Sequence, residues 1–185
     1  MATSDVTTLT PDVTLDLQRC PATLVSRDTR RAVRDFLMDS EVWREEAEIT
    51  GVTGTVEYAI PLGTYVNTRV HRILHVMVDN VYLNSQKYRL TADGKILFET
   101  SAGLETGDVI TAYVVFVPEI DSVLFLDEFM ETYAEPIIAR ARERLRLKPG
   151  VPWFDSAMAE KDHETYMKGL DEARVFLGGK GANIV

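Results

Sequence analysis

The sequence is poor in cysteine and has fewer basic than acidic residues. Among its 185 residues there is one cysteine, Cys20, so the chain can form neither an internal disulfide nor a cysteine-rich zinc site. No run approaches the roughly 18 apolar residues of a membrane helix, and the N-terminus lacks a signal-peptide pattern, so we expect no membrane contact. Lys and Arg number 20 against 29 Asp and Glu. The resulting net charge of −9 argues against tight binding of DNA or RNA, because phosphate recognition needs a positive surface.

The sequence also lacks the motifs of common enzyme classes. Gly178-Gly179-Lys180-Gly181 lacks the Ser or Thr that follows the lysine of a phosphate-binding loop, and no Gly-x-Ser-x-Gly elbow occurs. His71 and His75 fall in a β-like pattern, where residues four apart lie roughly 13 Å from each other, too far to bind one zinc ion. His163, flanked by two acidic residues, suits a solvated helix face. We therefore predict a protein without enzymatic activity, metal or cofactor.

Apolar periodicity places a helix near the start of the sequence. Residues 1–20, rich in Thr, Asp and Val, indicate an extended N-terminal arm with little regular structure. The first helix is expected over residues 21–40, beginning at Pro21 or Ser26. Its expected apolar face consists of Leu24, Val25, Ala32, Val33, Phe36 and Leu37.

The middle of the sequence alternates polar and apolar residues with the period of a β-strand. Strands are expected at residues 46–49, 55–60, 69–77, 81–83, 86–90, 95–99 and 109–117. Asp79-Asn80 predicts a tight hairpin turn, and Asp93-Gly94 predicts a second one. Short strands with frequent turns indicate an antiparallel module over residues 41–118.

The helical period returns over residues 119–177. Pro149-Gly150-Val151-Pro152 divides this stretch into two long helices, and Pro136 must kink the first of them or split it. The last helix is expected to end near Leu177, so that residues 178–185 form a flexible Gly-rich tail.

These elements predict an α+β protein. A helical bundle forms from the N-terminal helix and two long C-terminal helices, and an antiparallel β-sandwich or small barrel is inserted between them in the chain. The expected parts are the arm (1–20), the first helix (21–40), the β module (41–118), the C-terminal helices (119–177) and the tail (178–185).

Basic residues alternate along the end of the first of these two C-terminal helices. They are Arg140, Arg142, Arg144, Arg146 and Lys148, and a spacing of two spreads them around the helix. One interpretation is a solvated helix end whose cations complement the helix dipole. The other is a charge contact between copies of the chain, with complementary acidic residues at Asp127, Glu128, Glu131 and Glu135.

Several short segments share their order and spacing with a known protein family. They are Arg31-Ala32-Val33-Arg34-Asp35-Phe36-Leu37, Ser40-Glu41-Val42-Trp43-Arg44-Glu45-Glu46, Gly54-Thr55-Val56-Glu57-Tyr58, Val70-His71-Arg72-Ile73, Phe129-Met130-Glu131-Thr132-Tyr133-Ala134-Glu135, the break Pro149-Gly150-Val151-Pro152-Trp153, and Gly169-Leu170-Asp171-Glu172-Ala173-Arg174. Over about residues 25–180 the chain resembles the head-to-tail adaptor proteins of tailed bacteriophages, also called neck or head-completion connector proteins. Pro136 departs from the family pattern, which has an uninterrupted helix there.

The resemblance implies a structural virion protein. Such adaptors form a homo-oligomeric ring, usually of about twelve copies, beneath the portal protein at the capsid vertex. The ring extends the DNA channel without specific DNA binding and offers an attachment platform to a tail or nozzle/stopper protein. The protein would be made in the host cytoplasm and reside in the virion neck. By resemblance, the portal-binding residues would be Phe176, Leu177, Gly178, Gly179, Lys180, Gly181, Ala182, Asn183, Ile184 and Val185.

Two other functions remain open from the sequence. The first is another structural role, as a tail-completion or baseplate protein with a similar plan of helices and strands. The second is a carbohydrate-binding β-sandwich module, which would display exposed aromatic residues on one sheet face. The candidates for such a face are Tyr58, Tyr65, Tyr82 and Tyr88.

Overall fold

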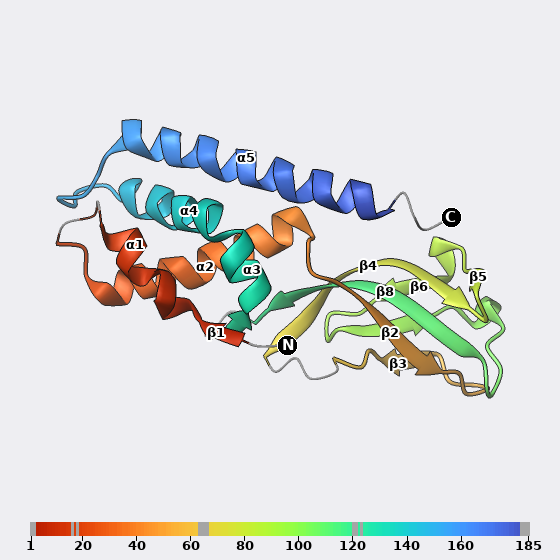
Figure 1. Ribbon diagram of the computed structural model, residues 1–185. Coiled ribbons are helices and arrows are strands. Elements are labelled where there is room, and N and C mark those ends of the chain that lie inside the picture. Colours follow the sequence, from red (N-terminus) through yellow and green to blue (C-terminus); the bar gives the residue numbers. More distant parts are fainter. Residues whose placement is uncertain are drawn as a thin grey trace. The chain divides into compact units, whose positions relative to one another are not determined.

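The structure, a computed structural model, is an α+β protein made of two compact units (Figure 1). It describes residues 3–15, 17, 19–62, 67–119, 122 and 124–181. The helical unit comprises residues 1–42 together with residues 120–185, and the β unit comprises residues 43–119. The α+β class and the antiparallel strand pairing predicted from the sequence are confirmed. The boundaries between the units lie within two residues of the expected 41 and 118.

The helical unit contains five α-helices and one small pair of strands among its described residues. Its elements are β1 (Thr3–Asp5), η1 (Val6–Leu9), α1 (Thr10–Thr14), α2 (Ala22–Ser40), β9 (Leu124–Leu126), α3 (Asp127–Thr132), α4 (Ala134–Arg146) and α5 (Ser156–Gly181). Helix α4 packs against both α2 and α5 (Figure 1). Both ends of the sequence thus contribute helices to one compact unit.

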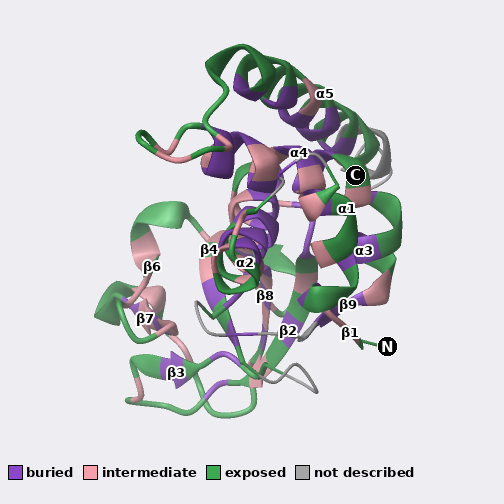
Figure 2. Cartoon of the chain, turned by 90° about the vertical axis from the view of Figure 1, so that its left-hand side faces the viewer, coloured by how far each residue is buried: buried purple, intermediate pink, exposed green. Residues whose placement is uncertain are grey.

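Apolar stripes at helical spacing form the core of this unit. The buried side chains come from α2 (Val25, Ala32, Val33, Phe36 and Leu37), α4 (Ile137, Ala141 and Leu145) and α5 (Tyr166, Leu170 and Ala173). Figure 2 shows these helices with buried residues on the sides that face one another and exposed residues outside. The Phe36 ring lies 4.9 Å from that of Tyr133 and 6.2 Å from that of Tyr166. Burial of each large apolar side chain contributes about 1.5–3 kcal/mol to folding.

The structure corrects the expectation that residues 1–20 form an extended arm with little regular structure. Residues 3–14 form β1, η1 and α1, and β1 pairs antiparallel with β9, with Thr3 opposite Leu126. The cause is apolar spacing that a Thr- and Asp-rich composition hides: Val6 and Val13 are wholly buried, and Leu9 is nearly so. Strand β9 was not expected either, because it has only three residues.

The split predicted near Pro136 is found: α3 and α4 meet at Tyr133, and Pro136 is the third residue of α4. The first N–H groups of a helix have no intrahelical acceptor, so Pro136 costs no hydrogen bond at that position. Helix α5 continues to Gly181, beyond the expected end near residue 177, because extending a formed helix is easier than nucleating one.

The described residues of the β unit form two antiparallel sheets. Its elements are β2 (Arg44–Thr50), β3 (Glu57–Ala59), β4 (Thr68–Val78), β5 (Val81–Tyr82), η2 (Ser85–Lys87), β6 (Tyr88–Leu90), β7 (Lys95–Phe98), η3 (Thr100–Ala102) and β8 (Val109–Pro118). One sheet has the order β2-β8-β4-β5, and the other has the order β3-β7-β6. The hairpin predicted at Asp79-Asn80 is confirmed, since both residues have positive φ angles, of 50° and 64°.

Along residues 109–114 of β8 the four-stranded sheet has one buried face and one face with exposed and half-buried residues, whereas Val115 and Val117 are buried on the second face as well. Ala47, Val76, Ile110, Ala112 and Val114 are buried on the first face. The period of two along each strand then directs their neighbours in sequence to the opposite face. Two irregularities in β4, between Val70 and Arg72 and between Ile73 and His75, shift its register against β8.

Candidate interaction surfaces

Helix α5 has a charged outer face that ends in two apolar side chains. Lys168, Asp171, Glu172, Val175 and Phe176 line a shallow hollow near its C-terminal end. Lys168 and Glu172 form an ion pair of 3.8 Å, whereas Val175 is 76% exposed and Phe176 is 51% exposed. Val175 and Phe176 thus form a small exposed apolar patch beside charged residues.

This end of α5 includes part of the predicted portal-binding segment. The side chains of Phe176 and Leu177 are described, with Phe176 exposed and Leu177 half-buried. Residues 178–181 are described as the last turn of α5 by their backbone alone. Residues 182–185, the remainder of that prediction, lie outside the described residues.

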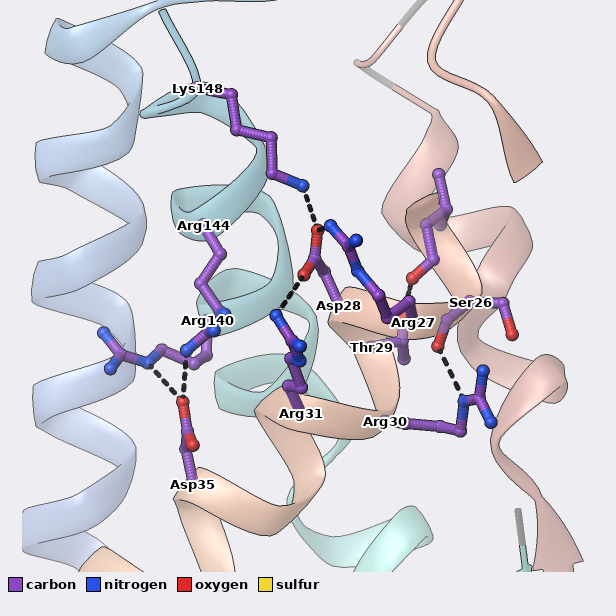
Figure 3. A network of polar contacts seen from close by, with 11 residues as sticks. Ser26, Arg27, Asp28, Thr29, Arg30, Arg31, Asp35, Arg140, Arg144 and Lys148 are labelled. Atoms are coloured by element: carbon purple, nitrogen blue, oxygen red, sulfur yellow. Dashed lines mark hydrogen bonds and ion pairs between the residues drawn. The ribbon is translucent and has the colours of Figure 1, made fainter. Parts of the chain in front are cut away.

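A second cluster consists of ion pairs between α2 and the end of α4 (Figure 3). Asp28 is buried, and its carboxylate contacts Lys148 as well as Arg27 at 3.5 Å and Arg31 at 3.9 Å. Three cations around one buried carboxylate compensate the cost of removing that charge from water. The cluster therefore joins α2 to the end of α4.

Asp35, two turns further along α2, forms ion pairs with two of the alternating arginines (Figure 3). Its Oδ2 lies 2.8 Å from Arg144 Nη1 and 3.4 Å from Arg140 Nε. Arg140 also donates to Glu143 Oε2 at 2.8 Å, and its guanidinium lies over the Tyr166 ring at 4.9 Å from the centroid. Arg140 therefore connects α2, α4 and α5.

The other two arginines of the row also have partners in the same chain. Arg146 is buried and donates to the carboxylate of Asp162 on α5. Burial raises the pKa of Asp162, although the Arg146 charge acts in the opposite direction. Arg142 donates to the backbone carbonyl of Asp12. These contacts decide against the interpretation of a merely solvated helix end.

The charge contacts predicted between copies of the chain involve the same arginines. Arg146 is only 3% exposed, so it has little surface to offer a second copy. Of the acidic residues in that prediction, Glu128 and Glu131 are exposed on α3, and Asp127 at its first turn is half-buried. A contact between copies through these acidic residues stays a prediction.

A third cluster lies on the outer face of the four-stranded sheet. Glu46 on β2 and His75 on β4 are both opposite Tyr113 on β8, so the three side chains project from the same face. The His75 ring stacks on that of Tyr113 at 4.1 Å and lies 5.2 Å from that of Tyr82, which is 61% exposed. Sequence reasoning missed this cluster because its members are up to 67 residues apart and meet only through strand register.

Hydrogen bonding and burial perturb the titration of this cluster. The Tyr113 hydroxyl donates to the Glu46 carboxylate, and this raises the pKa of Tyr113. Burial lowers the pKa of His75, while the Glu46 charge raises it by a smaller amount. His75 Nε2 is buried without a hydrogen-bond partner among the described residues. A neutral imidazole is therefore favoured between the rings.

The tyrosines named for a carbohydrate-binding face do not share one surface. Tyr58 is buried, with its ring 5.7 Å from that of Phe98, and its hydroxyl bonds the backbone of Val52. Tyr88 is half-buried on the three-stranded sheet, whereas Tyr82 is exposed on the four-stranded sheet. Tyr65 lies outside the described residues. The burial of Tyr58 counts against that function.

Within the described residues, no three or more His, Cys, Asp or Glu side chains are grouped as a metal site. None of the helices in that part of the chain combines the length and apolar character needed to cross a bilayer. The chain matches no model of a protein family and no curated protein.

Proposed function

We propose that this protein is a non-enzymatic component of a tailed-phage virion, where it forms an adaptor ring between the portal and the tail. The observation that carries the proposal is the exposed apolar end of α5, formed by Val175 and Phe176. It lies where the resemblance to head-to-tail adaptors expects the portal contact to begin. In this role the ring extends the DNA channel and offers a platform for tail attachment.

The small apolar area of this contact suits a ring in which each copy binds the portal weakly and many copies bind at once. Complete burial of an exposed Val or Phe side chain contributes about 1.5–3 kcal/mol, so two of them give one copy only a modest affinity. A ring engages many equivalent sites at once, and avidity then multiplies this modest contact into stable attachment. The net charge of −9 also suits a channel through which DNA slides without adhering.

A double substitution at the end of α5 tests the proposal. Val175→Glu with Phe176→Glu places two charges on the exposed apolar end, and neither residue belongs to the buried core. We expect the variant to remain helical by circular dichroism and to lose cosedimentation with portal rings of its own virus. Met158→Glu, on the first turn of the same helix and 36% exposed, is the matched control and is expected to bind as the unmodified protein does.

The result also separates the adaptor from a tail-completion or baseplate protein. Virions assembled with the double variant are expected to be filled heads that lose DNA and carry no tails, as seen by electron microscopy. Full portal binding by the double variant would contradict the adaptor proposal. Normal heads that bear shortened or incomplete tails would favour the tail-completion role.

A further inference from the structure

Strand β2 lies at the edge of the four-stranded sheet, and only β8 pairs with it among the described strands. Phe116 N donates to Trp43 O at 3.0 Å, and Gly51 N donates to Asp108 O at 2.7 Å. In an antiparallel pair, alternate residues direct their N–H and C=O groups towards the neighbouring strand. Odd-numbered residues of β2 therefore face β8, and Glu46, Glu48 and Thr50 direct their backbone groups to the unpaired side.

The same three residues are exposed. By register with Tyr113 and Thr111, the Glu46 and Glu48 side chains project from the outer face of the sheet. Glu46 accepts the Tyr113 hydroxyl, which holds its carboxylate in place. The side of β2 that no described strand pairs with thus combines backbone hydrogen-bonding groups with two carboxylates two residues apart, one of them already oriented.

Charge decides which strand can pair with this edge. In the antiparallel register that sets Glu46 of one copy opposite Glu48 of the other, a second copy of β2 would place like charges against each other, and only a shifted register would bring Arg44 opposite a glutamate. Like charges directly opposite each other destabilise a strand pair, and charged edge residues are a known protection against self-association. A strand with Lys or Arg at alternate positions would instead place a cation opposite each carboxylate.

We propose that the unpaired side of β2 is a docking site for an extended basic segment of a partner protein. The segment joins the sheet as a fifth strand beside β2 and forms backbone hydrogen bonds with Glu46 and Glu48. Its basic side chains, on the outer face, pair with the two carboxylates. Main-chain bonds supply affinity in this binding mode, and the alternate side chains supply specificity. The inference does not depend on the adaptor role.

The test uses the full chain and a synthetic seven-residue peptide of alternating lysine and valine, with blocked ends. Amide hydrogen exchange by NMR is the readout. In the free protein we expect fast exchange at Glu46 and Glu48 and slow exchange at Ala47 and Ile49, whose N–H groups face β8. The peptide is expected to slow exchange at Glu46 and Glu48 at least tenfold, with little change at Ala47 and Ile49.

Two controls separate strand pairing from charge attraction. The same peptide N-methylated at alternate residues keeps its charge but cannot donate to β2, and we expect it to give no protection. Glu46→Lys with Glu48→Lys is expected to weaken peptide binding by about tenfold or more. Glu99→Lys, an exposed glutamate after β7, changes charge away from β2 and is expected to have little effect.

Three outcomes would overturn the inference. One is equal binding of the methylated peptide, which would mean attraction by charge alone. Another is no protection by any basic peptide, which would mean that the glutamates only protect the edge. The third is a concentration-dependent dimer of the unmodified protein whose formation protects Glu46 and Glu48.

Discussion

His75 lies between the rings of Tyr113 and Tyr82 with its Nε2 buried, so its protonation requires a charge in a poorly hydrated position. Burial places its pKa below the ordinary value near 6.5. Between the lowered folded pKa and the unfolded value, the unfolded chain binds more protons than the folded one. The stability of the β unit therefore falls as the pH drops below about 6.5.

An NMR titration of the imidazole checks this expectation. The midpoint for His75 is expected below 6.5, and Glu46→Gln is expected to lower it further, because the substitution removes the nearby negative charge that favours the imidazolium. Thr111→Val, on the same face but not opposite His75, is the control and is expected to leave the midpoint unchanged. A midpoint above 6.5, or an upward shift in the Glu46→Gln variant, would show that burial does not dominate.

Helices α4 and α5 pack tightly where Gly169 lies against the Pro136 ring. A Cβ added there would lie 2.6 Å from Pro136 Cγ, well inside van der Waals contact. Gly→Ala in a helix normally stabilises by up to about 1 kcal/mol. Here we expect Gly169→Ala to destabilise the helical unit by about 1–3 kcal/mol through overpacking, measured by urea unfolding followed at 222 nm.

The Pro136→Ala background identifies the cause of that loss. If the proline ring is the obstacle, Gly169→Ala costs markedly less in this background than in the unmodified protein, and the two substitutions are not additive. Equal costs in both backgrounds would assign the effect to another neighbour. Gly169 and Pro136 together thus explain how an apparent helix breaker is accommodated in the bundle.

Local sequence patterns were sufficient to predict the long helices and the hairpin turn. They did not predict contacts between residues that are far apart in the sequence. The stripe around Phe36 predicted α2, and Asp79-Asn80 predicted the β4–β5 turn, because each signal lies within a few neighbouring residues. The pairing of β1 with β9 joins residues more than 110 apart in sequence, so no local pattern contains it. The partners of the alternating arginines were missed for the same reason: Arg144 and Asp35 meet only through tertiary packing.

The β unit is one continuous segment of the chain with its own buried side chains. The helical unit, in contrast, is assembled from both ends of the chain. We expect a fragment of residues 43–119 to fold alone, with a strand-type circular dichroism spectrum and one cooperative thermal transition. A fragment of residues 1–42 is expected to be largely unfolded, because α2 then lacks α4 and α5. Lack of a transition in the first fragment, or stable helix in the second, would contradict this division.

The discontinuous helical unit also determines an order of events during protein synthesis. When the ribosome has released residues 1–119, the β unit is complete, but the apolar stripe of α2 has no α4 or α5 to cover it. That stripe stays open to nascent-chain chaperones until translation reaches the last helix. Slowing the ribosome between residues 120 and 156 would thus prolong the interval in which this apolar stripe is uncovered and able to aggregate.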